Sequence, residues 1–263
     1  MQDIFPPDMT LWEAFSHITS RVVVRYMFFA TLAFLLFYVV LKRPLWFRKI
    51  QKRLPRLSDY RRDILYSVIS MAIFGTMATV ALYTFKDVNH VYKAPIEGWG
   101  AVWFYASFLW MLALHDTYFY WAHRFMHLKP VYRRVHLVHH RSTNPSPWTA
   151  YAFHPLEAVV EAGIIFVIAF TLPVHILAVI FFFIFQIAYN VYGHLGFELY
   201  PPGFHRTRLG RWINTSVSHN QHHSRNSGNF GLYFLFWDRA MGTLRADYGD
   251  AYDRATTRVT PAE

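Results

Sequence analysis

Long apolar segments constrain this 263-residue chain more than any other feature. A helix that crosses the hydrocarbon core of a bilayer needs roughly 20 apolar residues in a row. Residues 22–40 and 64–85 meet this requirement, and the shorter stretch 99–114 is extended by the aromatic residues that follow it. Hydrophobic residues make up 54% of the chain, which is high for a soluble domain. We therefore expect an all-α, multi-pass integral membrane protein.

A fourth apolar region, residues 158–192, is divided by Leu172 and Pro173. Because proline disfavours a helical conformation in the residue before it, this region predicts a helical hairpin in the membrane. The sequence leaves open whether either arm is long enough to cross. The loop 42–63 holds nine basic and two acidic residues, an excess that is typical of cytoplasmic loops. The chain beyond the third span should then also lie on the cytoplasmic side.

The net charge of +10 allows two kinds of partner, nucleic acid or the cytoplasmic surface of a membrane. The apolar segments favour the membrane, so no nucleic-acid partner is expected. The chain has no cysteine, which excludes disulfides, thiolate metal sites and cysteine nucleophiles. Arg25 lies near one end of the first apolar segment, and we expect its side chain to reach toward the membrane interface.

Three short histidine clusters follow the membrane segments: HRFMH at 123–127, HLVHH at 136–140 and HNQHH at 219–223. Residues three and four apart share one face of a helix, so each cluster presents two or three imidazoles on one stripe. One stripe rarely supplies four ligands to one ion, so three segments predict a shared centre with room for two metals. Imidazole suits iron, copper and zinc. The eight candidate ligands are His123, His127, His136, His139, His140, His219, His222 and His223.

Further candidates surround these clusters. His194 ends the second arm of the hairpin and is expected to be a ninth ligand, while Asn190, one helical turn earlier, and His154 are possible direct or water-mediated ligands. Ligating imidazoles need acceptors for their other ring N–H. The acidic residues expected in that role are Asp116, Glu157 and Asp238, with Glu161 and Glu198 also available.

The segments HDTYFYWAHRFMH, HLVHH, NPSPWTAYAFHPLE, HNQHH and NFGLYFLFWDRAMGT together resemble the fatty acid hydroxylase superfamily, also called the sterol desaturase family. The resemblance covers about residues 110–245. It implies an oxygenase with two iron ions per chain, held by the eight clustered histidines, and it matches His194 to a further family histidine. Such an enzyme hydroxylates a lipid with O2 and two externally supplied electrons. Chain-hydroxylating members often have histidine where this sequence has Asn190.

We expect transmembrane helices in residues 1–114, a catalytic domain in 115–250 that includes the hairpin 158–192, and a tail in 251–263. The histidine clusters should form a helical cap on the cytoplasmic face that holds the dimetal centre. No catalytic residue beyond the metal ligands and no binding motif for another cofactor is apparent. The substrate pocket is expected among aromatic residues, for which the candidates are Trp148, Tyr151, Phe153, Phe185 and Tyr189.

Electrons must come from outside, because the sequence has no haem, flavin or iron–sulfur motif. A ferredoxin or a cytochrome b5-like protein is the expected donor. The basic residues that could form its docking surface are Arg133, Arg134, Arg141, Arg206, Arg208 and Arg211.

A lipid desaturase with the same centre is the alternative activity. An alternative of another class is a histidine-rich metal transporter or a haem-binding membrane electron carrier. A transporter should have ionisable residues in mid-membrane, and these spans have almost none. A haem carrier needs facing histidines inside its spans, whereas most of these lie outside them.

Overall fold

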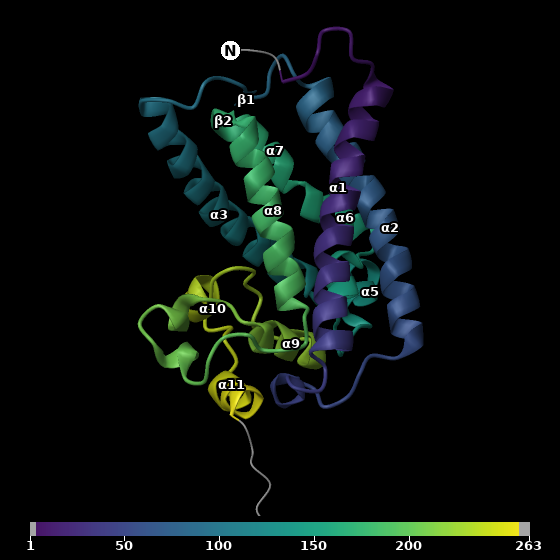
Figure 1. Cartoon of the computed structure of the whole chain (residues 1–263), viewed down its shortest axis with the longest axis vertical. Coiled ribbons are helices and arrows are strands. Elements are labelled where there is room, and N and C mark those ends of the chain that lie inside the picture. The colour runs from purple at the N-terminus through teal and green to yellow at the C-terminus, as the bar shows by residue number, and fades with distance from the viewer. Residues whose placement is uncertain (1–3, 258–263) are drawn as a thin grey trace, which may run out of the picture.

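A bundle of long helices with a helical cap at one end forms the architecture of the computed structural model, which describes residues 4–257 (Figure 1). The expected all-α fold is confirmed. The bundle comprises α1 (Leu11–Phe34) and its π-helical extension Leu35–Val40, α2 (Leu57–Thr79) and its π-helical extension Val80–Thr84, α3 (Trp99–Met126), α6 (Pro155–Ala162), α7 (Ile164–Thr171) and α8 (Ile176–Gly193).

Short elements build the cap and the connections that lead to it. Between α3 and α6 the chain forms α4 (Lys129–Val131), the π-helical turn Tyr132–His136, α5 (Leu137–His140) and a 3-10 turn, Pro147–Tyr151. The remaining elements are the 3-10 turns Trp46–Arg48, Phe204–Arg206 and Gly210–Trp212 and the helices α9 (Ser216–Arg225), α10 (Phe236–Ala240) and α11 (Tyr248–Thr256). The expected boundary at residue 250 falls inside α11, and the division into domains stays a prediction.

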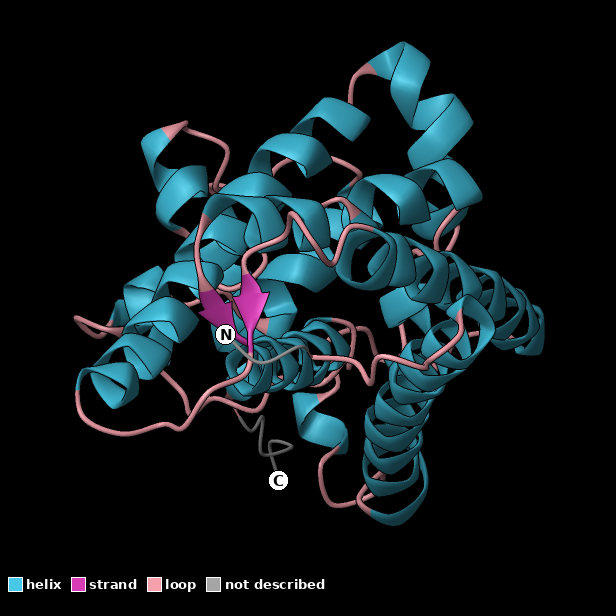
Figure 2. Ribbon diagram, turned by 90° about the horizontal axis from the view of Figure 1, so that it is seen from above, coloured by secondary structure: helices cyan, strands magenta, loops and turns pink. Residues whose placement is uncertain are grey.

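Two short strands close the opposite end of the bundle, near the N-terminus (Figures 1 and 2). β1 (Val91–Tyr92) pairs in parallel with β2 (Val174–His175), with Val91 opposite Val174. Leu172 has the extended conformation expected before a proline, with φ −142° and ψ 145°, and the chain reverses there. The strand pair thus ties the turn of the predicted hairpin to the loop between α2 and α3.

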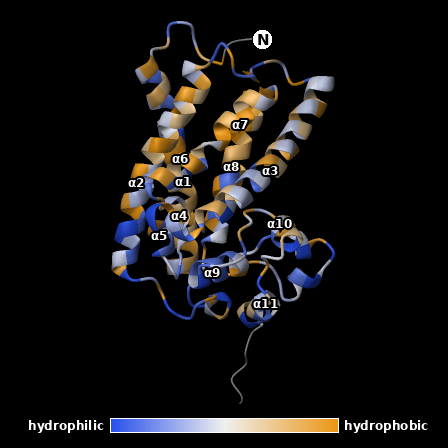
Figure 3. Ribbon diagram, turned by 180° about the vertical axis from the view of Figure 1, so that it is seen from behind, coloured by the Kyte–Doolittle hydropathy of each residue, from blue (hydrophilic) through white to orange (hydrophobic). Residues whose placement is uncertain are grey.

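Three helices in the described part of the chain are long and apolar enough to cross a membrane: Leu11–Val40, Leu57–Thr84 and Ile176–Gly193. Apolar residues dominate the bundle and hydrophilic ones the cap (Figure 3). The first helix begins eleven residues earlier than expected, because Thr10 and Glu13 form a capping box that starts it at Leu11.

The expected third span is not among these three helices. Residues 99–114 form the first part of α3, whose 28 residues are enough to cross, but the apolar stretch ends at the polar pair His115 and Asp116 and holds three tryptophans, which favour the membrane interface. In the hairpin, α8 is long enough to cross, whereas the other arm is divided into α6 and α7 at Gly163.

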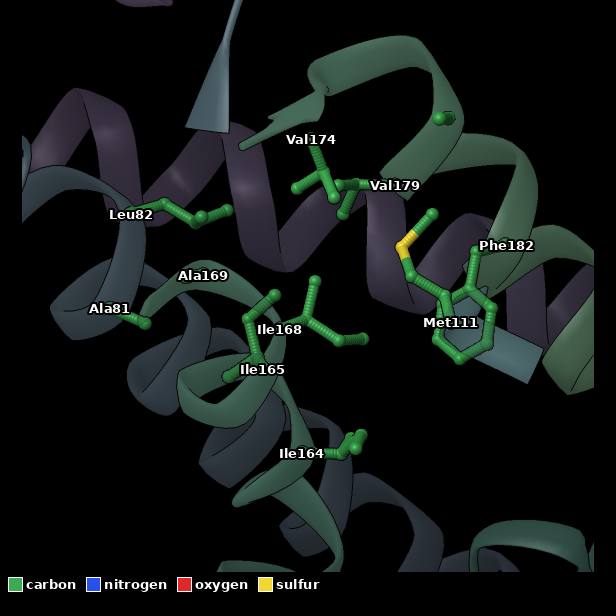
Figure 4. Close-up of a cluster of buried hydrophobic side chains, with 11 residues drawn as sticks. Ala81, Leu82, Met111, Ile164, Ile165, Ile168, Ala169, Val174, Val179 and Phe182 are labelled. Atoms are coloured by element: carbon green, nitrogen blue, oxygen red, sulfur yellow. The ribbon is translucent and has the colours of Figure 1, made fainter. Parts of the chain in front are cut away.

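The core of the bundle lies where α3, α7 and α8 meet (Figure 4). Met111 of α3, Ile168 of α7 and Phe182 of α8 are each at most 1% exposed. A second core packs α1 and α2 against the 3-10 turn 147–151 and the cap end of α8. These contacts hold the ends of α3 and α8 at the border between bundle and cap.

Glycines permit two close helix contacts. Gly75 of α2 lies directly against Thr19 of α1, and a Cβ atom at Gly75 would overlap that side chain. Gly163 lies against the hydroxyl of Tyr118, which donates a hydrogen bond of 2.6 Å to the Val160 carbonyl. The break between α6 and α7 therefore lies where α3 approaches the hairpin.

The basic loop between α1 and α2 is also part of the packing of the cap. Lys49 is fully buried between the rings of Tyr38 and Phe197, and its Nζ lies 3.3 Å from the Asn144 Oδ1. The neighbouring Arg48 donates to two backbone carbonyls of the segment 198–200. Burial without an acidic partner lowers the pKa of Lys49 to about 7.

Replacing Gly75 should destabilise the contact between α1 and α2. The Gly75→Ala substitution adds a methyl group where no space exists, at an expected cost of about 1–3 kcal/mol, so the thermal unfolding temperature in detergent should fall. Gly100→Ala is the matched control, because its added Cβ has no neighbour closer than 3.6 Å. Equal unfolding temperatures for the two variants would contradict the packing argument.

The buried lysine should make stability depend on pH. The unfolded chain keeps Lys49 protonated up to about pH 10.4, whereas the folded chain releases that proton near pH 7. Since the unfolded state binds more protons in this window, this group's contribution to folding becomes more favourable as pH rises from 7 to 10. The unfolding temperature of the wild type relative to Lys49→Met should therefore increase over that range. The exposed Lys93→Met variant should show no such relative change, and an increase of equal size there would refute the assignment.

Candidate metal centre

The structure gathers all nine histidines predicted as ligands at the border of bundle and cap. His123 and His127 lie at the cap end of α3, and His194 follows the last residue of α8. The second cluster lies on the π-helical turn 132–136 and α5, and the third lies on α9. All are buried except His127, which is partly buried.

The nine side chains form two groups, and in each group the candidate ligand atoms lie within 4.8 Å of one another. The first group has five members and the second has four. The first consists of His123, His127, His136, His140 and His222, and the second of His139, His194, His219 and His223.

The two groups divide the second and third histidine clusters in a way that the sequence analysis did not predict. Histidines four residues apart stay together: His136 and His140 belong to the first group, and His219 and His223 to the second. The third member of each cluster crosses over, so His139 joins the second group and His222 the first. The second and third clusters thereby contribute to both groups, whereas the first cluster, His123 and His127, belongs wholly to the first group.

Three of the five rings in the first group have a hydrogen-bond partner at the outward nitrogen. His136 Nδ1 lies 2.7 Å from the Glu157 carboxylate, and His123 Nδ1 lies 2.9 Å from the Phe230 carbonyl. His222 Nδ1 lies 2.7 Å from the carbonyl of Gly228. Because carbonyl oxygens only accept, the Nδ1 atoms of His123 and His222 carry the proton and their Nε2 atoms present a lone pair inward.

The second group follows the same pattern. His194 Nδ1 donates to the Asn190 carbonyl at 2.8 Å, and His223 Nδ1 donates to the Ser142 carbonyl at 3.1 Å. His194 Nε2 then lies 3.1 Å from the Nε2 of His223 and 2.9 Å from that of His219.

Inward lone pairs at such distances repel one another unless a cation lies between them. His194 Nε2 is 3.1 Å from His223 Nε2, although the Nδ1 of each ring donates its proton to a backbone carbonyl. Convergent, unprotonated imidazole nitrogens whose other nitrogens are fixed by hydrogen bonds are the donor set that a transition metal requires. The residues present therefore fit two metal ions.

Burial also keeps these rings neutral. It lowers the pKa of His123 and of His194 to about 4, and that of His140 to about 3. Neutral imidazole is the form that binds a metal, so neither group has to release many protons on binding.

The three acids expected near the ligands have different roles. Glu157 contacts a ligand histidine directly. Asp238 accepts from the backbone N–H groups of Phe230 and Gly231, at 2.8 Å each, and so fixes the carbonyl that holds His123. Asp116 accepts from two backbone N–H groups at 233–234 and has no bond to a histidine.

The other two candidate acids lie near the centre without bonding to a histidine ring. Glu198 accepts from the Val217 N–H at 3.1 Å and so supports the start of α9. Glu161 lines the space beside the histidines.

Asn190 and His154 lie outside both groups. Asn190 donates from its amide to the Ala150 carbonyl at 2.8 Å, but its side chain also lines the space next to the histidines. His154 caps α6, where its Nδ1 accepts from the Leu156 N–H at 3.2 Å. His154 thus has a structural role at the start of the helix that carries Glu157.

A cavity in the bundle leads to the histidines. It contains about 960 Å³ of empty space, including the part that opens to the surroundings, and α1, α2, α3, α6, α7 and α8 all line it. A smaller space of about 240 Å³ touches both histidine groups. The two share four lining residues, so they adjoin; these are Phe119, Phe153, Glu161 and Asn190.

Two of the five aromatic residues predicted to line the substrate pocket line this cavity. Tyr151 and Phe153 line the cavity, whereas Trp148, Phe185 and Tyr189 do not. The sequence analysis did not predict Phe74, Arg21 and Gln186 as lining residues. The sequence alone does not show which side chains on a helix face the cavity.

Comparison with known proteins is consistent with this geometry. The family model described as fatty acid hydroxylase matches residues 108–243, just over half of the chain. The Delta(7)-sterol 5(6)-desaturase of Gibberella zeae is 28% identical over 189 residues, which cover 72% of this chain and 52% of that protein. The lathosterol oxidase of Homo sapiens is 26% identical over 227 residues, covering 84% and 71%.

This chain thus spans about half the length of the Gibberella protein. No solved structure matches it. The names of both relatives denote oxidation, which supports the expectation of an oxidoreductase. From the matched segment, which contains all nine histidines, we conclude that the chain belongs to the fatty acid hydroxylase family.

Proposed function

We propose that this protein is a membrane-bound, non-haem di-iron oxygenase that hydroxylates a lipid. The observation that carries the proposal is the pair of buried imidazole groups next to a membrane cavity. Bound iron would supply, from O2 and two electrons, an oxidant strong enough for an unactivated C–H bond. The protein contributes the neutral imidazoles that hold the iron and the cavity that orients the substrate.

The two histidine groups would each hold one ion. Five imidazoles serve the first site and four the second, and Asn190 lies beside the second site as a support for His194. Iron rather than zinc or copper is proposed because of the family, since imidazole alone suits all three.

The centre is proposed to face the cytoplasm. The basic loop 42–63 and the cap lie at the same end of the bundle, and the excess of Lys and Arg in that loop favours the cytoplasmic side (Figure 1). The six arginines named as a docking surface are all exposed. Their positive charge favours binding of an acidic electron donor such as a ferredoxin or a cytochrome b5-like protein.

Desaturation with the same centre is the second candidate, favoured by the names of the curated relatives. Comparative lipidomics of cells with and without the gene separates the two. A lipid heavier by one oxygen atom supports hydroxylation, and one lighter by two hydrogen atoms supports desaturation. If no lipid class changes during aerobic growth, the proposed oxygenase function is wrong.

Removing one histidine from either group should lower the iron content of anaerobically purified protein. His219→Ala affects the second group and His222→Ala the first, although both lie on α9. We expect each variant to lose about one of two irons per chain, measured by elemental analysis, because each site loses a ligand. His17→Ala, an exposed residue outside both groups, is the control. Unchanged iron in both α9 variants would exclude these groups as the iron sites.

Neutralising Glu157 should weaken iron binding without removing a ligand. Glu157→Gln loses the charge that holds the His136 ring, and such outer contacts contribute about 10–100-fold to metal affinity. Competition against a chelator measures the affinity for Fe(II). Glu97→Gln, in an exposed loop, should bind iron as the wild type does. Wild-type affinity in Glu157→Gln would show that this carboxylate does not support the site.

A further inference from the structure

Two arginines lie in the wall of the membrane cavity. Arg21 and Arg25 are four residues apart on α1 and therefore share a face of that helix, and both line the cavity. The Arg25 guanidinium lies 5.6 Å from the centre of the Phe183 ring on α8. Its Nε is buried and has no hydrogen-bond partner.

Neither arginine has an acidic partner. Within the described residues no carboxylate lies at ion-pair distance from Arg21 or Arg25. A guanidinium removed from water costs free energy unless an anion or several acceptors replace the lost hydration. The sequence predicted that Arg25 would reach to the interface, but its side chain instead packs on Phe183 beside the cavity.

The positively and negatively charged side chains of the cavity lie in different parts of its wall. Glu161 is the only acidic residue among the described residues that line it, and it lies where the cavity adjoins the histidines. Most of the wall between is apolar, including Val22, Phe74 and Val179. An elongated molecule with one anionic end is therefore bound more favourably with that end at the arginines than at Glu161.

We propose that the cavity binds a lipid whose polar end is an anionic oxygen group, a carboxylate or a phosphate, held by Arg21 and Arg25. Guanidinium groups bind both anions through charge-assisted hydrogen bonds. The apolar part of the lipid then extends toward Phe119 and Phe153, next to the histidines. This inference names the substrate class of the proposed oxygenase and so rests on that function for its catalytic meaning.

The helix geometry also sets where on the lipid the reaction occurs. Phe183, beside Arg25, and Asn190, beside the histidines, are seven residues apart on α8. At 1.5 Å per residue this separation is about 10 Å along the helix. The oxidised position should therefore lie about 10 Å from the anionic group rather than next to it.

Binding of four probes to the purified full chain in detergent tests the inference. The probes are palmitate, 1-palmitoyl lysophosphatidate, hexadecanol and cholesterol, and the quantity measured is the Kd. The wild type should bind at least one of the two anionic probes about tenfold or more tightly than hexadecanol, because the alcohol lacks the charge. The better of the two anionic probes identifies carboxylate or phosphate as the natural group.

Arginine variants show whether the two side chains cause that preference. Arg21→Gln/Arg25→Gln should bind the anions and hexadecanol equally, and Arg25→Lys should keep most of the preference. Arg61→Gln, an exposed arginine outside the cavity, is the matched control and should behave as wild type. If the double variant does not fold, Arg21→Gln alone, at an exposed position, should still reduce the preference.

Equal binding of the acid, the phosphate and the alcohol by the wild type would overturn the proposal, and so would tighter binding of cholesterol than of either anion. A preference that persists in the double variant would also overturn it. The iron content of the same samples distinguishes failure of this proposal from failure of the proposed oxygenase function. Iron-free protein that prefers anions refutes only the oxygenase, and iron-loaded protein without the preference refutes only the anionic substrate.

Discussion

Mutual repulsion among buried imidazole nitrogens is the constraint on which the rest of the structure depends. Nine neutral rings converge, and backbone carbonyls hold the outer nitrogens of four of them, His123, His194, His222 and His223, so that their lone pairs point inward. Such an arrangement is stable only with cations inside it. Because the ligands come from four segments that are far apart in sequence, ions that bind there also hold the cap to the bundle, and metal binding contributes to folding.

The long helices place this centre at the membrane border. α8 begins directly after β2 and α3 begins after the loop that follows β1, and they end at His194 and His127, so each carries a ligand candidate from the apolar bundle into the cap (Figures 1 and 3). The core around Met111 and Phe182 fixes their separation. Rigid helices thus determine two of the four ligand-bearing segments. The proposed lipid substrate would then reach the centre from the bundle side, through the cavity, without leaving the bilayer.

Local sequence patterns predicted the helices, whereas the contacts between distant segments depend on long-range packing and could not be predicted. The apolar runs predicted two spans and the hairpin turn at Pro173, and the spacing of the clustered histidines predicted eight of the nine that the structure groups together. His194, the ninth, was expected from its place at the end of the hairpin. The split into two groups was not predictable, because it depends on how α5 and α9 face each other. The contact of Arg25 could not be predicted for the same reason. A sequence shows a charge in an apolar segment, but it does not show that the ring of Phe183 lies beside it on another helix. Lys49 is the third case, since its burial depends on Phe197 and Asn144, which are far away in sequence.

Exclusion of water links the cavity to the chemistry. Phe119 and Phe153 line both the membrane cavity and the histidine space, and both are less than 10% exposed. A strong oxidant formed in a wet site would be quenched or would attack the ligands, whereas an apolar entrance admits a lipid chain in preference to water. The same apolar entrance cannot by itself orient a chain, because alkyl contacts are nearly independent of position along it. Orientation must therefore come from polar contacts, and the charged residues of the cavity supply them: Arg21 and Arg25 on α1, and Glu161 beside the histidines.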